Sequence, residues 1–358
     1  MSTPDSSAPD PITPEETPGL PRETFTRWAA TAVPEVGAGW RAEVISGGLS
    51  NITYRIRGEQ ATVIVRRPPL GKLLPSAHDM AREHRVLSAL QATDVPVPRV
   101  LALCDDPDVA GAPFYVMAEV EGEVYREPDQ TARLSPAQRE ALADDLVDVL
   151  ARIHAVDLDA TGLRDFGRTD GYVERQLRRW TAQWEASRTR EVEGMPELLA
   201  ALAREQPAQA DATLVHGDYR LDNTLVAQRD GLPRVAAVVD WELSTLGDPL
   251  ADLATWLTYW SGPGEDGSAV PVAQGLTAHE GFPTGDEIAQ RYAARTGRDL
   301  THLGFYRAFT DWRLAVILEG VHARYLAGRS MGEGYDRVGP AVPLLVQRAL
   351  ARLDWTPT

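Results

Sequence analysis

The sequence HGDYRLDN at residues 216–223, followed by VVDWE at residues 238–242, decides the fold of this chain. Asp218 is followed five positions later by Asn223, and a second aspartate, Asp240, ends an apolar run. Three short apolar runs flank these polar residues and predict strands: residues 213–215, 224–226 and 235–239. The polar residues are therefore expected at strand ends and on a loop, where functional side chains are common.

This spacing matches a kinase catalytic loop, H-R-D-x-x-x-x-N, which is followed by a further aspartate at a strand end. Asp218 is the predicted base or orienting group for a hydroxyl, and Asn223 and Asp240 are the predicted magnesium ligands. Magnesium prefers oxygen ligands of this kind. Taken alone, Asp218 and Asn223 also fit an ordinary turn. The flanking strands and Asp240 favour the catalytic interpretation.

Two features argue against a regulated protein kinase. Gly217 stands where the kinase loop has arginine. Asp248, which begins the next predicted helix, follows Asp240 by only eight positions, which leaves little room for a phosphorylatable activation loop. The pattern therefore indicates phosphoryl transfer and disfavours protein-kinase activity.

Composition limits the class of protein. The 358 residues include 36 basic and 52 acidic side chains, a formal charge of −16 that disfavours binding to nucleic acid or anionic membranes. A single cysteine, Cys104, excludes a disulfide framework. No signal peptide and no apolar run of membrane-spanning length is evident. We expect a cytoplasmic enzyme; its oligomeric state is not predicted.

The chain is predicted to be α+β and bilobal. Residues 1–24 are expected to form a disordered tail, because residues 1–21 are rich in Pro, Ser and Thr. The predicted parts are an N-terminal lobe at 25–117, a hinge at 118–122 and a C-terminal lobe at 123–358. The first lobe is expected to hold a small antiparallel sheet and one main helix, with strands at 40–45, 52–56, 62–65, 99–103 and 114–117 and the helix at 78–90.

After Gly122 the pattern becomes mostly helical. Ser135, Pro136 and Gln138 give a strong helix start. Helices are predicted at 135–154, 172–187, 196–204, 249–260, 287–295, 305–326 and 341–353. Residues 261–283 form a long Gly- and Pro-rich segment, which is typical of a functional lid or a disordered loop.

Nucleotide phosphates have candidate ligands in the first lobe. Gly47 and Gly48, in a predicted hairpin, allow the backbone to approach a phosphate, although an ordinary turn has the same pattern. Arg66 ends a strand in the place of the lysine of the kinase V-A-I-K motif, and Glu83 on the next helix is its predicted ion-pair partner. Arg67 should face the opposite side of the strand.

Other polar residues near the loop are interpreted as structural. His216 is expected to orient the loop through backbone hydrogen bonds, since Asp218 already fills the role of base. His154, at a helix end, has no metal-ligand spacing. Asp248 is a predicted helix cap, and Asp252, four positions on, shares its helix face as a second support of the loop. Glu242 is a candidate for an accessory metal or acceptor contact.

With these residues in place, residues 25–350 resemble the aminoglycoside phosphotransferase family, within the kinase-like fold that includes choline kinase. The motifs are the catalytic loop, VDWE at 239–242, GDP at 247–249 with DLA at 252–254, and MAEVEG at 117–122. The resemblance implies that the Ala118 carbonyl and the Val120 N–H, in a hinge that begins at Met117, meet adenine. It also implies that Ser50 and Asn51 of the hairpin belong to the nucleotide site.

A more specific similarity is to the kinase-like domain fused to some acyl-CoA dehydrogenases and to its free-standing bacterial relatives. It rests on segments 66–69, 77–80, 113–117, 291–292 and 313–318. The similarity implies that arginine is the common residue at the position of Arg66 in this subgroup. The resemblance implies ATP or GTP as donor, magnesium, and a small hydroxylated acceptor, either an aminoglycoside or a hydroxyacyl compound.

The alternative is a kinase-like nucleotide-binding protein with weak or no turnover, for which the replacement of lysine by Arg66 is the only support. A hydrolase of the nucleophile-elbow type lacks its G-x-S-x-G motif. The acceptor is expected between the catalytic loop and the helices after residue 285, with Asp311, Trp312 and Glu319 as candidate contacts. For Trp312, core packing is the favoured interpretation.

Overall fold

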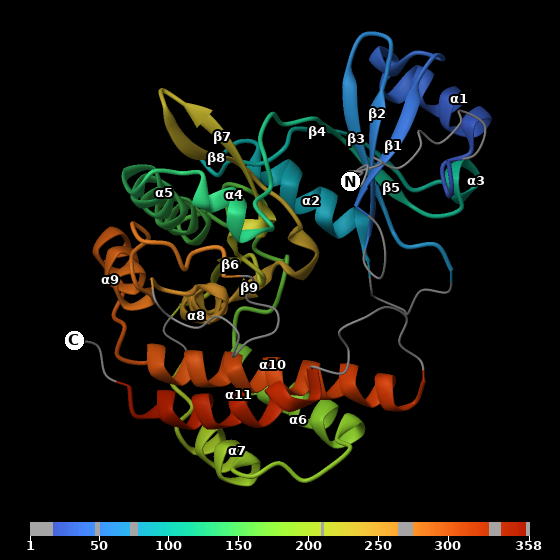
Figure 1. The fold of residues 1–358 in the computed structure, drawn as a ribbon. Helices are drawn as coiled ribbons and strands as arrows, with labels where there is room; N and C mark the ends of the chain where they lie inside the picture. Colours follow the sequence, from blue (N-terminus) through green and yellow to red (C-terminus); the bar gives the residue numbers. More distant parts are fainter. Residues whose placement is uncertain are drawn as a thin grey trace, which may run out of the picture. The chain divides into compact units, whose positions relative to one another are not determined.

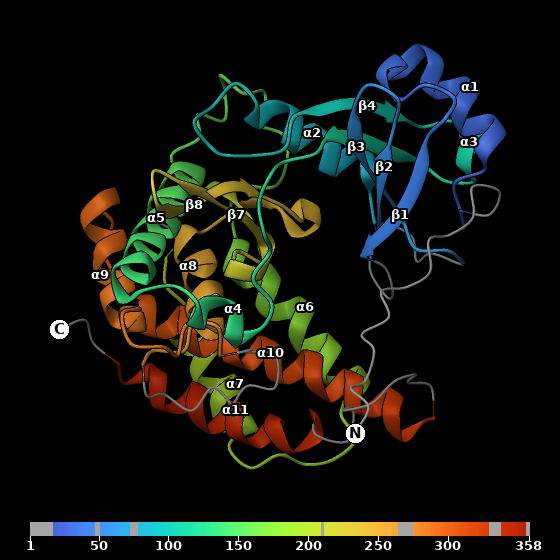
Figure 2. The ribbon, with the colours of Figure 1, turned by 45° about the horizontal axis from the view of Figure 1, so that its top comes forward.

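The structure is a computed structural model that describes residues 17–46, 51–71, 78–208, 211–263, 275–328 and 338–355 (Figures 1 and 2). The chain divides into two compact units. The N-terminal unit comprises residues up to 92 together with 97–121, and the C-terminal unit comprises 93–96 together with 122–358. Each unit is described by itself.

The N-terminal unit contains a five-stranded antiparallel sheet of order β1-β2-β3-β5-β4. Its strands are β1 (Arg41–Ser46), β2 (Ile52–Arg57), β3 (Thr62–Arg67), β4 (Val100–Cys104) and β5 (Phe114–Ala118). Consecutive side chains of a strand point to opposite faces. In β3, Val63 and Val65 therefore enter the main core of this unit, and Arg66 faces the other side, toward α2 (Met80–Leu90).

One face of this sheet is covered by an element that the sequence analysis did not predict, the helix α1 (Arg22–Ala32). Phe25 and Ala29, four positions apart, are buried on one side of this helix and join the core with the short helix α3 (Pro107–Ala110). Leu20, inside the predicted tail at 1–24, is also fully buried. The ordered chain thus begins before residue 25. Residues 1–16 lie outside the described part of the chain.

The C-terminal unit is mostly helical. Its helices are α4 (Pro128–Ala132), α5 (Pro136–His154), α6 (Tyr172–Ser187), α7 (Met195–Arg204), α8 (Pro249–Tyr259), α9 (Gly285–Thr296), α10 (Leu303–Leu326) and α11 (Val338–Leu353). The long helices α10 and α11 pack side by side (Figure 1). Within the described ranges, no helix has both the length and the apolar character needed to cross a membrane.

Two small antiparallel sheets surround the loop at 216–223. One pairs β6 (Thr213–Val215) with β9 (Thr245–Gly247), and the other pairs β7 (Thr224–Arg229) with β8 (Leu232–Val238). The sequence analysis missed β9, a three-residue strand whose TLG sequence has no clear β signature. The predicted α+β class, with a small antiparallel sheet and a larger helical part, is confirmed.

The segment 93–96 is hydrogen-bonded to strand β8 and to helix α5. The Pro96 carbonyl accepts a hydrogen bond of 2.8 Å from the Val238 N–H, and the Asp94 carbonyl accepts one of 2.8 Å from Arg152. These four residues therefore belong to the C-terminal unit, although the chain on either side of them belongs to the N-terminal unit.

Candidate active site

Asp252, on α8, anchors the start of the 216–223 loop. Its carboxylate accepts hydrogen bonds from the backbone N–H groups of His216, at 2.7 Å, and Gly217, at 2.8 Å. The imidazole of His154 lies 3.2 Å from the same carboxylate. The contacts with His216 and His154 are buried and the contact with Gly217 is partly buried, so the backbone of the loop has a fixed acceptor.

These contacts determine the charge of Asp252. Burial acts to raise the pKa of Asp252, but the hydrogen bond from His154, the nearby His154 and His216 side chains and the His216 N–H together outweigh it. The pKa of Asp252 therefore lies below its ordinary value, and the carboxylate is held in its ionised form.

The predicted catalytic residues are held together by a second set of contacts. The Asn223 amide donates hydrogen bonds to the Asp218 carboxylate, at 2.9 Å, and to the Asp218 carbonyl, at 2.8 Å. The Val239 N–H donates to the Asn223 carbonyl at 3.0 Å, and the Val239 carbonyl lies 3.0 Å from His216 Nε2. The loop and the residue before Asp240 are thus joined into one frame.

Asp240 follows β8 with a left-handed backbone conformation, φ +66°. Aspartate accepts this conformation more readily than most residues, because its short polar side chain can form local hydrogen bonds. The turn directs the chain into a 3-10 turn, Trp241–Leu243, that carries the partly exposed Glu242. Within the described residues no cluster of three or more His, Cys, Asp or Glu side chains forms a metal site, and magnesium, which commonly retains water ligands, requires only one or two carboxylates.

Arg220 is a residue of the loop that the sequence analysis did not identify. Its Nε lies 3.4 Å from the Asp218 carboxylate and 3.1 Å from the Asp222 carboxylate, and its guanidinium stacks over Tyr259 at 4.8 Å. Burial raises the pKa of Asp218, while the charges of Arg220 and His216 and the hydrogen bond from Asn223 oppose this effect. The only available signal was a basic residue two positions after the aspartate.

A small cavity lies against this part of the loop. It is lined by Arg220, Leu221, Asp222, Trp256, Tyr259, Trp260, Leu276 and Thr277. Its volume is about 20 Å³, and its wall combines one cation, one carboxylate and three aromatic rings. The cation, Arg220, is the lining residue that contacts the Asp218 carboxylate.

In the N-terminal unit, the predicted ion pair between Arg66 and Glu83 is present. Arg66 Nε lies 3.1 Å from the Glu83 carboxylate, and the two side chains are 10% and 1% exposed. Arg67 points to the opposite face, as predicted, where it donates to the carbonyls of Gly19 and Ala110. Arg66 is thus the one of the two arginines that faces α2.

We expect Glu83→Ala to lower the free energy of unfolding by about 3–5 kcal/mol, because it leaves the Arg66 charge buried without its partner. Urea unfolding monitored by circular dichroism measures the change. The matched control is Glu23→Ala, which breaks an exposed pair with Arg27 on α1 and should cost at most about 1 kcal/mol. Equal losses in the two variants would contradict the prediction.

Four nucleotide-site candidates come from the predicted hairpin. Three of them, Gly47, Gly48 and Ser50, lie outside the described residues. Asn51 is buried and its side chain is hydrogen-bonded to His78 at 2.8 Å.

The hinge candidates lie at the end of β5. The side chain of Met117 is buried, and the Ala118 N–H donates to the Arg99 carbonyl at 2.8 Å. Among the described residues, no hydrogen-bond partner is seen for the Val120 N–H.

The candidate acceptor contacts on α10 were wrong for two residues. Asp311 is fully buried and pairs with Arg348 at 2.7 Å and with Arg352 at 3.2 Å. Glu319 is fully buried and accepts hydrogen bonds from the backbone and hydroxyl of Thr189. α10 is an interior helix of its unit, so its acidic side chains are neutralised within the fold. Trp312 is fully buried, which confirms core packing.

The residues interpreted as structural have that role. Asp248 caps α8 by accepting from the Leu250 N–H at 2.9 Å, and it also accepts from the Tyr306 hydroxyl at 2.6 Å. His154 joins Asp252 to the hydroxyl of Tyr292, which lies 2.6 Å from Nδ1. His216 contacts backbone groups, as predicted.

Comparison with known families agrees with this geometry. Residues 41–291 match the model of the phosphotransferase enzyme family. The chain belongs to this family. The match includes both the Arg66–Glu83 pair and the 216–223 loop, and the family phosphorylates hydroxyl groups of small molecules.

Curated relatives of this phosphotransferase-family chain are longer proteins. It is 39% identical over 314 residues to acyl-CoA dehydrogenase family member 10 of mouse, a match that covers 86% of the chain and 28% of the relative. It is 35% identical over 291 residues to acyl-CoA dehydrogenase family member 11 of human, a match that covers 80% of the chain and 36% of the relative. The chain thus spans about a third of the length of these relatives.

Solved structures show the same fold. A Ralstonia eutropha protein, solved as a candidate aminoglycoside phosphotransferase, is 34% identical, with coverage of 92% of this chain and 98% of that chain and a TM-score of 0.77. The GDP complex of an aminoglycoside 2′-phosphotransferase is 14% identical, with coverage of 91% and 98% and a TM-score of 0.61. The second likeness is one of fold alone. The predicted kinase-like fold of phosphotransferases is confirmed.

Proposed function

We propose that this protein transfers the γ-phosphoryl group of ATP or GTP to a hydroxyl group of a small molecule, with magnesium. The observation that carries the proposal is the frame of the C-terminal unit in which Asn223 donates to Asp218 and Val239 joins Asn223 to Asp240. An aspartate fixed by hydrogen bonds beside two further oxygen ligands is the arrangement that phosphoryl transfer requires.

Within this proposal, the Asp218 carboxylate orients the acceptor hydroxyl and receives its proton as the oxygen attacks phosphorus. The Asn223 and Asp240 side-chain oxygens fit magnesium, since the amide nitrogen of Asn223 is used on Asp218 and leaves its oxygen free for the metal. Bound magnesium would neutralise charge on the phosphates. Asn223 thereby serves two functions, because its nitrogen also keeps the Asp218 carboxylate in one orientation.

The donor site is proposed in the N-terminal unit. Arg66, oriented by Glu83, would hold phosphate oxygens through its planar fork of N–H donors. The hairpin that includes Gly47, Gly48, Ser50 and Asn51 would contribute backbone donors, and Met117, Ala118 and Val120 would meet the base. One fold neighbour was solved as a complex with GDP, so a guanine nucleotide is included beside ATP in the test.

The acceptor hydroxyl is proposed to reach Asp218 from the side of Arg220. The cavity there has a volume of about 20 Å³, room for a single water molecule, so the acceptor enters it with a small group at most and lies mainly outside it. The aromatic side chains of the cavity wall suit an apolar group, and the Arg220 cation is paired with Asp218 and Asp222. The names of the relatives add acyl compounds to the candidates, and those of the fold neighbours add aminoglycosides. We therefore propose a hydroxyacyl compound or an aminoglycoside as acceptor.

The experiment that tests the proposal measures nucleotide consumption by the purified chain with and without magnesium against a panel of acceptors. The panel contains hydroxyacyl compounds, aminoglycosides, macrolides and amino alcohols, each with ATP and with GTP. Consumption should depend on magnesium and rise with one acceptor class. Magnesium-dependent nucleotide binding with no acceptor-stimulated turnover in any combination would instead favour a nucleotide-binding protein without kinase activity.

Arg220 is expected to affect how kcat/KM depends on pH. Asp218 acts as a base only when ionised, and its pKa is already raised by burial, which the Arg220 charge opposes. Arg220→Gln removes that cation and should raise the pKa of Asp218 further, so the acidic limb of the kcat/KM profile should move to higher pH. The control Arg220→Lys keeps the charge and should shift the limb less. A limb unchanged in Arg220→Gln would mean that another group controls it.

A further inference from the structure

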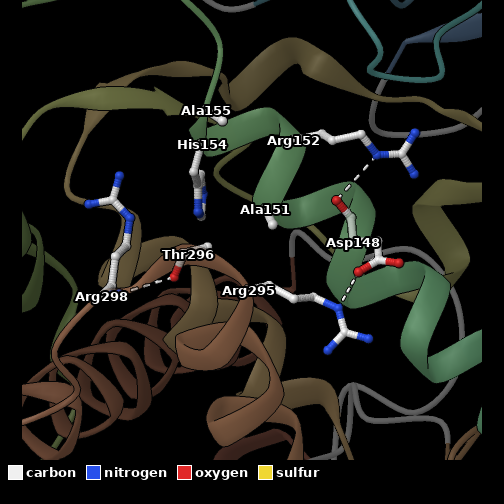
Figure 3. A pocket seen from close by; sticks show the side chains of 8 residues that line it. All are labelled: Asp148, Ala151, Arg152, His154, Ala155, Arg295, Thr296 and Arg298. Carbon is white, nitrogen blue, oxygen red and sulfur yellow. Dashed lines mark hydrogen bonds and ion pairs between the residues drawn. The ribbon is translucent and has the colours of Figure 1, made fainter.

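A second cavity of the C-terminal unit, of about 560 Å³, lies between the C-terminal ends of α5 and α9 (Figure 3). It is lined by Asp148, Ala151, Arg152, His154, Ala155, Arg295, Thr296 and Arg298. Its volume is in the range of small-molecule sites, and neither the catalytic interpretation nor the core packing uses it. None of its lining residues belongs to the 216–223 loop.

The cavity concentrates positive charge in a chain whose formal charge is −16. Its lining includes three arginines and one aspartate. Arg152 donates to the carbonyls of Asp148 and Asp94, and within the described residues no carboxylate pairs with it. Arg152 is half-buried, and its hydrogen bond to Asp94 is exposed, so its guanidinium is accessible from the cavity. A guanidinium that bonds only to backbone carbonyls is suited to an anionic ligand.

The helix ends explain only part of this arrangement. A basic residue in the last turn stabilises the C-terminal dipole of a helix, which accounts for Arg152 on α5 and Arg295 on α9. Arg298 lies beyond the end of α9, where no such role applies, and its guanidinium pairs with Asp211 at 3.1 Å. Arg295 pairs with Asp144 at 3.1 Å and also with Asp148.

We propose that this cavity binds a small molecule that carries at least two anionic groups, carboxylate or phosphate. In Figure 3, Arg298 lies on one side of His154, and Arg152 and Arg295 lie on the other. Arginine side chains therefore lie on both sides of the cavity; Arg295 and Arg298 each have a carboxylate partner, and Arg152 bonds to backbone carbonyls. Arginine binds carboxylate and phosphate through paired N–H donors, which makes two anionic groups better matched than one.

The site is connected to the 216–223 loop through its own wall. His154 lines the cavity, and its two ring nitrogens contact the Tyr292 hydroxyl at 2.6 Å and the Asp252 carboxylate at 3.2 Å. The same carboxylate accepts from the N–H groups of His216 and Gly217. Local opening that frees these amides breaks their hydrogen bonds to the carboxylate that His154 contacts. A ligand that packs on His154 opposes such opening, because it binds the closed arrangement only.

Calorimetric titration tests the binding step, with citrate as the polyanionic probe and acetate as the single-charge probe. The full chain is used without nucleotide or magnesium and at matched ionic strength, so the outcome is independent of the proposed phosphotransfer. Citrate should bind saturably with one site and acetate should not. Arg152→Gln and Arg298→Gln should each weaken citrate binding by about tenfold or more, as loss of a charged hydrogen bond predicts.

Two further variants keep the binding test interpretable. Arg152→Lys retains the charge and should bind more tightly than Arg152→Gln. Arg204→Gln removes an exposed arginine of α7, whose partner is Glu205, and should bind as the wild type does. Absence of saturable citrate binding to the folded wild type would overturn the proposal. The proposal would also be overturned if Arg152→Gln and Arg298→Gln were folded and bound citrate as tightly as the wild type does. The citrate would then bind at another site.

Amide hydrogen exchange tests the connection to the loop. With citrate at ten times its Kd, exchange at the His216 and Gly217 amides should slow by about tenfold, since binding lowers the open population by that factor. Tyr292→Phe removes the hydroxyl that contacts His154 but keeps the ring, so citrate should still bind while its effect on these two amides becomes smaller. Saturable binding with unchanged exchange at both amides would overturn the connection.

Discussion

Replacement of Asp218 with asparagine should lower kcat by about 10²–10⁴ on the true acceptor, the range expected when a general base is removed. Asparagine has nearly the same shape and can still form a hydrogen bond with Asn223, so the loop should keep its structure. It cannot accept the proton of the hydroxyl. Nucleotide binding should be retained, because the proposed phosphate ligands are elsewhere in the chain.

Steady-state kinetics with the acceptor found in the panel measure this effect, and nucleotide affinity is measured separately. The matched control is Asp222→Asn, which removes a carboxylate four positions away that also pairs with Arg220. It should reduce kcat by less than about tenfold, a smaller loss than removal of the base. Near wild-type turnover of Asp218→Asn, or an equal loss in both variants, would show that Asp218 is not the base.

The second large effect is expected from Asp252→Ala, which should lower the free energy of unfolding by about 3–5 kcal/mol. The variant leaves His154 without its buried carboxylate and the N–H groups of His216 and Gly217 without an acceptor. Each buried donor left unsatisfied costs free energy. Because the amides belong to the 216–223 loop, activity should fall together with stability.

Urea unfolding of Asp252→Ala and of the control Glu174→Ala measures the difference. Glu174 forms an exposed pair with Arg178 on α6 and should contribute at most about 1 kcal/mol. The lowered pKa of Asp252 sets the pH dependence. The part of its stabilisation that comes from ionisation is complete above the unfolded-state value of about 3.9 and is lost as the pH falls through the folded-state value, so the gap between wild type and variant should narrow in acid. A gap of unchanged size in acid would show that ionisation of this carboxylate does not contribute to it.

The sequence predicted well those features that depend on local order along the chain. Strands around the 216–223 loop, most helices of the C-terminal unit and the Arg66–Glu83 pair all follow from spacing and periodicity. Helix α1 was missed because its first residues follow a Pro-rich segment, and its burial depends on contacts with strands far along the chain, as with Phe25 and Phe114. Periodicity alone does not show which amphipathic segment next to a Pro-rich stretch will be covered.

The errors at the candidate site have a related cause. An acidic residue in a predicted helix, such as Asp311, has the same sequence signal whether it faces a ligand or an arginine of a neighbouring helix. Only the packing of α10 against α11 shows that Arg348 and Arg352 neutralise it. Arg220 was missed because the sequence gives no sign of its contacts. Its contacts with Asp218 and Tyr259 depend on the conformation of the loop.

The assignment of residues 93–96 to the C-terminal unit affects how this protein can be divided or recombined. The chain passes between the units three times, so no single cut yields either unit as one contiguous gene segment. A fragment that starts at residue 122 would lack the Pro96 carbonyl that accepts from Val238. An exchange that moves residues 1–358 together keeps the 93–96 segment with the unit that it contacts, whereas a cut at residue 122 separates them. The 314-residue match to the mouse relative, which is longer than either unit, is consistent with such joint inheritance.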